Sequence, residues 1–132
     1  DNGSWGGVSR TLRAGGPVNE DWIFVGWGDG FVCRVDPQDP DVVYYESQDG
    51  NIVRRNLKTG ASEGIRPTGS GLRSNWNTPY ILSAHNGQIV YSGTQYLHRS
   101  VKQGAGAKII SPELTRTKRG SATAITESPK NG

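Results

Sequence analysis

Hydrophobic and polar residues alternate in a series of short runs along the chain, and a turn signal closes each run. Runs such as "VVYYE" and "IVRRN" place every second side chain on one face, which is the period of a β-strand. Glycine, proline and Asp-Gly pairs separate the runs and favour tight turns. The pattern predicts eight strands in the middle of the chain, at Phe31–Val35, Val42–Glu46, Ile52–Asn56, Ser62–Arg66, Tyr80–Ser83, Gln88–Gly93, Tyr96–Ser100 and Lys108–Ser111.

These strands fall into two similar groups of four. The stretch "FVCRVDPQDPDVVYYESQDGNIVRRNLKTG" aligns with "YILSAHNGQIVYSGTQYLHRSVKQG", so that Val43-Tyr44 matches Val90-Tyr91. A third start at "SATAITESPKNG" sets a period of about 45 residues, within the range of β-propeller blades. The runs "SWGGVS" and "DWIFVG" predict the last two strands of a preceding unit. We therefore expect an all-β fold, an incomplete β-propeller whose blades are four-stranded antiparallel sheets.

The repeat divides the chain into parts of one domain over residues 1–132. They are half a blade at 1–30, blades at 31–72 and 73–116, and the start of another at 117–132. Closed propellers contain about four to eight blades. We therefore expect other blades, in the same chain or a neighbouring one, to cover the open ends. The absence of an initiator methionine and of a signal peptide favours a piece of a longer polypeptide.

Composition supports an all-β chain and limits its partners. With 19 glycines, 7 prolines and 33% hydrophobic residues, the sequence disfavours long helices and has no apolar run that could span a membrane. The net charge of +3 is mild, and part of the excess lies in "TRTKRG", which lacks stacking aromatic residues. We expect no nucleic-acid partner. The single cysteine, Cys33, excludes an internal disulfide, and we expect it to be a small buried apolar residue.

Several long motifs resemble a known family. "DNGSWGG", "DWIFVGWGDGF", "NWNTPYILSAHN" and "HRS…ISPELT" are similar to the sortilin-like, BNR (Asp-box) repeat β-propellers of large bacterial secreted proteins. The resemblance implies an extracellular or cell-envelope location, and such proteins are often labelled glycosyl hydrolase-like. The Asp-box pattern Ser-x-Asp-x-Gly-x-Thr-Trp is degenerate here, because "SVKQGAGA" keeps Ser100 and Gly104 but has Lys102 in place of the aspartate. The resemblance implies that this motif is a structural turn between strands.

Tryptophans with nearby polar residues are the strongest candidates for a ligand surface. Indole rings stack on sugars, and amides or carboxylates bind hydroxyl groups. A tryptophan at a blade boundary can equally pack between sheets, and we expect Trp76 to be at least partly buried there. The Gly-Asp-Gly at 28–30 reads first as a turn. The candidate ligand residues are Asp1, Asn2, Trp5, Trp27, Asp29, Asn75, Trp76 and Asn77.

These residues are consistent with two interpretations of function. The favoured interpretation is a non-catalytic binding or scaffold segment with a carbohydrate or protein ligand and no cofactor. The alternative is part of a sialidase-like or xyloglucanase-like glycoside hydrolase, with catalytic carboxylates here or on missing blades. Glycoside hydrolysis needs two acids across the scissile bond. Asp29 with Asp1 or Glu46 could supply them, but nothing in the sequence sets their spacing, and we assign no catalytic residue.

Metal and cationic sites have weaker support. His85 and His98 are isolated from each other and from any cysteine pair, so we expect surface or turn positions and no metal site. The stretch "DPQDPD" reads as a turn because of its prolines. A sialidase-type site would need an arginine triad. Arg54, Arg55 and Arg99 are predicted on outer strands, which places them poorly for a central pocket.

Overall fold

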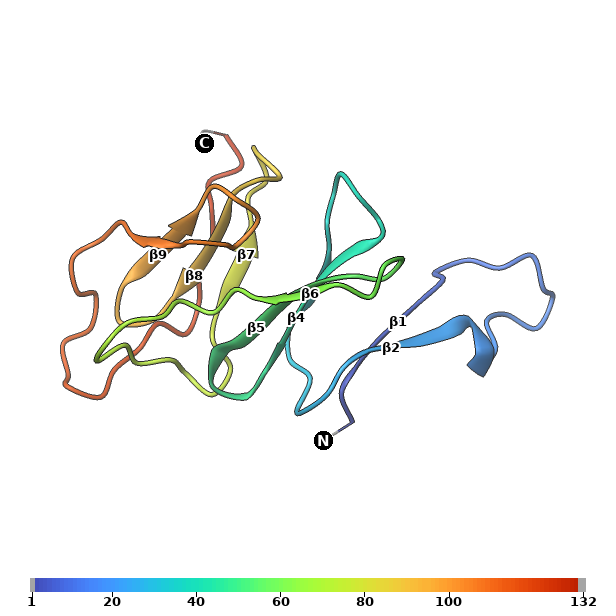
Figure 1. The fold of residues 1–132 in the computed structure, drawn as a ribbon, viewed down its shortest axis with the longest axis horizontal. Coiled ribbons are helices and arrows are strands. Elements are labelled where there is room, and N and C mark those ends of the chain that lie inside the picture. The colour runs from blue at the N-terminus through green and yellow to red at the C-terminus, as the bar shows by residue number, and fades with distance from the viewer. Residues whose placement is uncertain (1, 131–132) are drawn as a thin grey trace.

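The described residues, 2–130 of the chain, form three antiparallel β-sheets and almost no helix in this computed structural model (Figure 1). The first sheet pairs β1 with β2, the second has the order β3-β4-β5-β6, and the third has the order β7-β8-β9-β10. The strands are β1 Ser4–Gly7, β2 Trp22–Gly26, β3 Cys33–Val35, β4 Val42–Ser47, β5 Asn51–Asn56, β6 Ser62–Gly64, β7 Tyr80–Leu82, β8 Val90–Gly93, β9 Leu97–Ser100 and β10 Lys108–Ile109, with 3-10 turns η1 Asn19–Asp21 and η2 Gln48–Gly50.

Each strand of the second and third sheets pairs with the next strand in the sequence. The all-β class and the eight strands expected from alternation are confirmed, with ends that shift by a few residues. Irregular segments follow the shorter strands; β6, for example, ends at Gly64 and not at Arg66. Over the described residues none of the sheets closes on itself. No helix among those residues has the length and apolar character that a membrane crossing requires.

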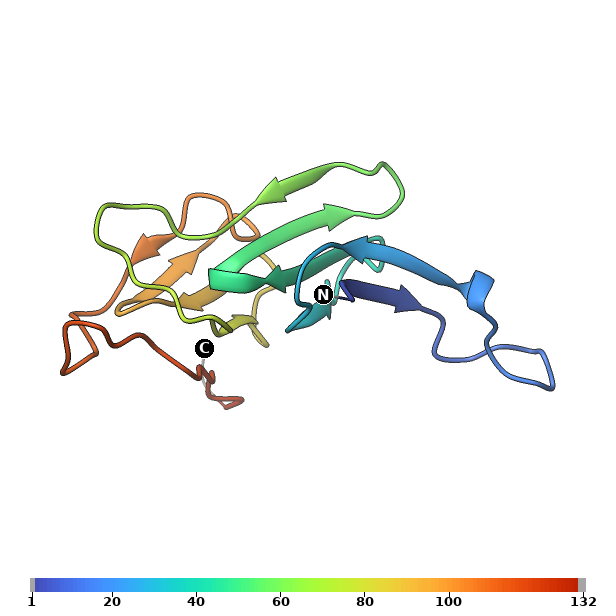
Figure 2. The ribbon, with the colours of Figure 1, turned by 90° about the horizontal axis from the view of Figure 1, so that it is seen from below.

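The second sheet lies between the other two (Figures 1 and 2). Side chains of β4 alternate between its two faces and so contact both neighbouring sheets. Tyr44 and Glu46 point to one face of this sheet, and Val43 and Tyr45 point to the other. The Tyr45 ring fills the space beside Gly26 of the first sheet, where an added Cβ would meet it. On the opposite side, the backbone N–H of Thr78, next to the third sheet, donates to Glu46. Both faces of the second sheet are therefore covered at β4, whereas the residues of the edge strands β3 and β6 are exposed.

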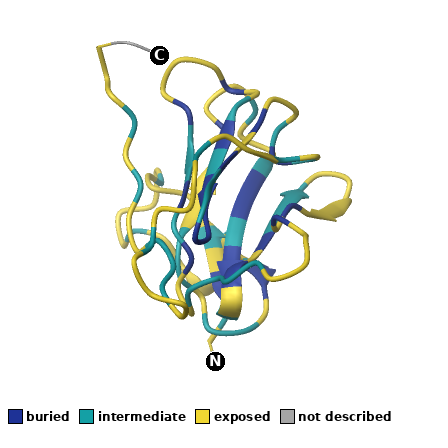
Figure 3. Ribbon diagram, turned by 90° about the vertical axis from the view of Figure 1, so that its left-hand side faces the viewer, coloured by how far each residue is buried: buried dark blue, intermediate teal, exposed yellow. Residues whose placement is uncertain are grey.

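The main core joins the second sheet to the third (Figure 3). The hydroxyl of Tyr80 on β7 lies 3.0 Å from the carbonyl oxygens of both Tyr44 and Val32. This contact fixes the first strand of the third sheet against β4 and the residue that precedes β3. The buried residues of this core are Tyr44, Ile52, Ile65, Tyr80 and Val90.

The first sheet is attached by fewer groups. Nη1 of Arg55, on β5, donates to the carbonyl oxygen of Val25 (2.6 Å), and the side chain is half-buried between the sheets. Nε of the same residue is buried without a hydrogen-bond partner among the described residues. Val25 itself is fully buried. One guanidinium and the Tyr45 ring thus provide much of this junction.

The turn between β9 and β10 contains the stretch "SVKQGAGA". Oγ of Ser100 accepts hydrogen bonds from the backbone N–H groups of Lys102 (3.0 Å) and Gly104 (3.1 Å) and donates to the carbonyl oxygen of Ala105 (2.6 Å). The hydroxyl of one serine therefore organises the turn.

Two expectations about the chain were wrong. No strand forms at 121–130, because this segment meets no partner strand; it instead lies against the third sheet, where Ala122 donates to the Thr94 carbonyl (2.8 Å) and Glu127 accepts from Ser83 (3.0 Å). Cys33 is exposed and not buried, because β3 is an edge strand whose three residues all reach solvent.

Candidate functional site

Three connecting segments meet at one end of the sheets. They are the crossover from β2 to β3 at 27–32, the β4–β5 turn at 48–50, and the segment at 74–79 that leads into β7. The backbone N–H of Asp29 donates to Oε1 of Gln48 (3.1 Å), and the N–H of Asp49 donates to the carbonyl oxygen of Trp76 (3.0 Å). The β4–β5 turn therefore holds the other two segments together. We call the surface formed by these three segments the end surface.

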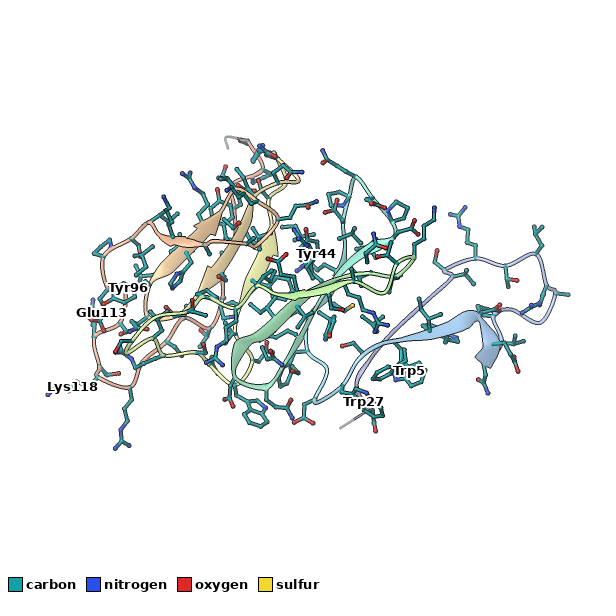
Figure 4. The ribbon with its side chains drawn as sticks, viewed as in Figure 1. Trp5, Trp27, Tyr44, Tyr96, Glu113 and Lys118 are labelled. Carbon is teal, nitrogen blue, oxygen red and sulfur yellow. The ribbon has the colours of Figure 1, made fainter. Side chains whose placement is uncertain are left out.

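An aromatic cluster borders the end surface on the first sheet (Figure 4). The Trp5 and Phe24 rings meet edge to face with centroids 5.3 Å apart, and the Phe24 and Trp27 rings are tilted with centroids 4.6 Å apart. Nε1 of Trp5 donates to the carbonyl oxygen of Asn2 (2.8 Å). Trp27 is 79% exposed. Its ring is therefore held on one side by Phe24 and open to solvent on the other.

Trp76 forms the second aromatic element of the end surface. Its ring contacts Phe31 edge to face, with centroids 6.3 Å apart. We expected Trp76 to be at least partly buried between two sheets; the side chain is 54% exposed, and its ring contact is with Phe31 of the β2–β3 crossover. Tyr80, four residues later, is the aromatic residue that enters the space between the second and third sheets. The structure therefore adds Trp76 to the accessible aromatic surface.

The other candidate residues differ in how available they are. Asn2 and Asn77 are exposed, whereas Asp29 and Asn75 are half-buried. The carbonyl oxygen of Asn75 accepts a hydrogen bond from Oγ1 of Thr78 (2.7 Å), so that residue also shapes its own loop. The candidate Asp1 lies outside the described residues. Asp29 on the 27–32 crossover and the amides Asn75 and Asn77 on the 74–79 segment thus lie on two segments that the β4–β5 turn joins.

Sequence reasoning missed two residues that build this surface. Phe24 links the two tryptophan rings of the cluster, and Gln48 links two loops. The repeat contained a signal for the glutamine, because Gln48 aligns with Gln95 of the second unit. Oε1 of Gln95 likewise accepts the backbone N–H of a residue that precedes the first strand of its sheet, Arg73 (2.8 Å). A shared glutamine therefore supports the entry loop in both units.

A buried carboxyl group lies beneath the end surface. Glu46 is fully buried on β4, and its Oε1 accepts the backbone N–H of Thr78 (2.5 Å). Oε2 has no hydrogen-bond partner among the described residues. Burial raises the pKa of Glu46 to about 7, although the hydrogen bond from Thr78 opposes the rise. At neutral pH this side chain is therefore close to its titration midpoint.

The structure does not make Glu46 and Asp29 an accessible pair of acids. Glu46 has no exposed surface, so a sugar at the end surface does not reach it in this conformation. The expectation for the histidines was wrong for His98, which is buried with Nε2 2.8 Å from Oγ1 of Thr94, and burial lowers its pKa. His85 is exposed. Within residues 2–130 no group of three or more His, Cys, Asp or Glu side chains is arranged to hold a metal ion.

Comparisons with known proteins identify no relative for this arrangement. No protein-family model matches the chain, and no curated protein or solved structure is significantly similar to it.

Proposed function

We propose that this chain is a binding segment of a secreted or cell-envelope β-propeller of the sortilin-like, BNR-repeat type, and that its end surface binds carbohydrate. The proposal rests on the exposure and packing of the Trp27 ring. Its indole is 79% exposed but rests on Phe24, which in turn rests on Trp5. Such a ring presents a flat apolar face that is already fixed in place, and exposed apolar patches mark interaction sites.

The chemistry of the end surface suits a neutral sugar. The apolar face of a pyranose ring would stack on Trp27, and the exposed amide of Asn77 would exchange hydrogen bonds with hydroxyl groups. Trp76 offers a second ring beyond the Gln48–Gly50 turn. A ligand with several sugar units would therefore find more than one stacking position.

The order of the strands supports the propeller part of the proposal. In both four-stranded sheets the strands follow sequence order, and the chain passes from the last strand of one sheet to the first strand of the next. The sheets pack face to face through Tyr80 on one side and Arg55 on the other. Blades of a propeller are built and packed in this way.

The outer face of the first sheet supports a partner for this segment. Trp5 and Trp22 are 54% and 47% exposed there, and a hollow between them is also lined by Asn19. The first sheet contains two strands in the described residues, whereas its neighbours contain four. We infer that further blades, from the same or a neighbouring chain, complete this sheet and cover its face.

Binding to a panel of immobilised polysaccharides tests the ligand. We expect retention of the wild-type protein by at least one neutral polysaccharide and about tenfold weaker binding by Trp27→Ala, because the stacking face is lost. Leu12→Ala is the matched control, since Leu12 is likewise an exposed apolar residue but lies in the β1–β2 connection. It should bind like the wild type.

Other results of the same experiment would contradict the proposal. If no polysaccharide is retained, or if Trp27→Ala and the wild type bind equally, the end surface is not a carbohydrate site. Release of reducing sugar by the wild-type protein would instead favour the glycoside hydrolase alternative.

A further inference from the structure

Glu46 occupies an unusual position for a carboxyl group. It lies on the face of β4 that is directed to the third sheet, opposite Ile52 on β5, and has no exposed surface. One oxygen accepts the Thr78 N–H at 2.5 Å, while the other has no partner among the described residues. An ionised carboxylate has room for about four hydrogen bonds, so a single donor leaves a buried charge poorly compensated.

The hydrogen bond to Thr78 is one of a small set that shapes the segment at 74–79. Oγ1 of Thr78 donates to the carbonyl oxygen of Asn75 (2.7 Å), and the Trp76 carbonyl accepts from Asp49 (3.0 Å). The carbonyl of Pro79, next to the start of β7, accepts from the backbone N–H of Gly93, the last residue of β8 (2.9 Å). Among these hydrogen bonds, the one to Glu46 is made by a side chain that can change its charge. The segment itself, "SNWNTP", contains no ionisable side chain.

Protonation changes what Glu46 can offer. In the neutral acid one oxygen still accepts the Thr78 N–H, and the proton on the other oxygen removes the buried charge. In the carboxylate the Thr78 hydrogen bond is charge-assisted and stronger, but the second oxygen still has no donor among the described residues. The cost of keeping this charge away from water favours movement of the segment or entry of water. The two states therefore differ in how firmly the 74–79 segment is held.

We propose that Glu46 is a proton-dependent positioning residue for the 74–79 segment. The protonated acid holds Thr78 in place, and deprotonation loosens the segment together with the Trp76 ring. For its effect on a ligand the inference rests on the proposed carbohydrate function, whereas the movement of the segment does not.

Other titratable groups around Glu46 do not reproduce this behaviour. Tyr80 on β7 interacts electrostatically with Glu46, and burial raises the pKa of its hydroxyl, so it stays neutral near pH 7. Tyr44, on the same face of β4, also has a raised pKa. Cys33 and Arg34 of β3 interact electrostatically with Tyr80, and partial desolvation of the exposed Cys33 thiol by neighbouring atoms raises its pKa. Ile52, the residue opposite Glu46 on β5, is not titratable.

The charge state of Glu46 can be followed directly in the unmodified protein. With glutamate labelled at the carboxyl carbon, we expect the Glu46 signal to titrate near neutral pH, well above an ordinary glutamate. The backbone amide of Thr78 should shift with the same midpoint, and its protection from hydrogen exchange should fall by about tenfold between about pH 6 and pH 8. A Glu46 signal that titrates near pH 4.5, or a Thr78 amide that does not shift, would overturn the proposal.

Glu46→Gln provides the matched variant, because the amide keeps an oxygen acceptor for Thr78 and cannot ionise. The Thr78 amide should then show no titration between about pH 6 and pH 8. In fluorotryptophan-labelled protein, the fluorine signal of each ring can be followed as the pH changes. The Trp76 signal should move with pH in the wild type only, and the Trp27 signal serves as the control in both proteins. A Trp76 signal that titrates equally in Glu46→Gln would contradict the assignment.

Ligand binding separates this inference from the proposed function. Where a polysaccharide binds, its affinity for the wild type should fall several-fold as the pH rises through 7 and stay constant for Glu46→Gln. Binding that is equally pH-dependent in both proteins counts against Glu46. If no polysaccharide binds but the Thr78 and Trp76 signals titrate, the positioning role stands and the carbohydrate function fails.

Discussion

At the scale of single residues, the molecule separates aromatic side chains that look alike in the sequence. "NWNTPY" contains Trp76 and Tyr80, and either could be the ring that enters the core. Alternation does not decide between them, because the segment before β7 is irregular and has no period to follow. The structure exposes Trp76 and buries Tyr80, whose hydroxyl reaches two carbonyl groups of the second sheet. The distinction follows from position, because Tyr80 is the first residue of β7 and Trp76 lies in the irregular segment before it.

This difference predicts unequal effects of substitution on stability. Trp76→Ala should lower the free energy of unfolding by about 1 kcal/mol or less, because more than half of the ring is already in solvent. Ile52→Ala, in the core, should lower it by about 2 to 5 kcal/mol. Urea denaturation at pH 6 measures both. A loss above about 3 kcal/mol for Trp76→Ala would mean that the ring is buried in solution.

At the scale of elements, period-two patterns identify strands well when a partner strand is present. The strands of the second and third sheets follow the alternating runs closely, because each run has a neighbouring hairpin strand to pair with. "SATAITESPKNG" resembles the start of such a unit but forms no strand over 121–130. Pairing depends on what lies beside a segment in space, and a local pattern does not contain that information.

The turn between β9 and β10 allows a matched pair of glycine substitutions. Gly104 has a φ of +97°, and a Cβ added there would lie 2.4 Å from Cδ1 of Ile65 in the core. Gly106 has a φ of +59° and open space around it. We expect Gly104→Ala to lower the free energy of unfolding by about 2 to 4 kcal/mol, against about 1 kcal/mol for Gly106→Ala.

Thermal or urea unfolding of these two variants provides the measurement. Equal effects would show that the turn moves away from Ile65 without penalty, so that the contact between the second and third sheets at this point is loose.

At the scale of the whole molecule, the sequence indicates where the end surface lies but not how it is held. Trp27 and Trp76 stand next to strand ends, which was enough to place both at a junction between sheets. The connection between them passes through Gln48 and Asp49, and Asp49 adopts a left-handed φ of 62°. Such contacts between distant loops arise from the packing of complete sheets, and no local sequence pattern predicts them.

The uncovered face of the first sheet predicts the behaviour of the isolated chain. We expect the 132-residue protein to associate with increasing concentration, because Trp5 and Trp22 expose a contiguous apolar surface beside an unpaired strand edge. Light scattering measures the mass. Trp22→Thr should shift the protein toward the monomer and Leu12→Ala should not. A wild-type protein that stays monomeric and unfolds cooperatively would contradict the need for a partner.

The core described above contains residues of the second and third sheets, and no residue of the first sheet within the described chain. The first sheet is the more easily detached part, held largely by Arg55 and Tyr45. Trp27 rests on Phe24 of that sheet, whereas Trp76 rests on Phe31 beyond the joint. A ligand that stacks on both rings would act as a clamp across the weakest joint of the molecule, and part of its binding free energy would appear as resistance to local unfolding.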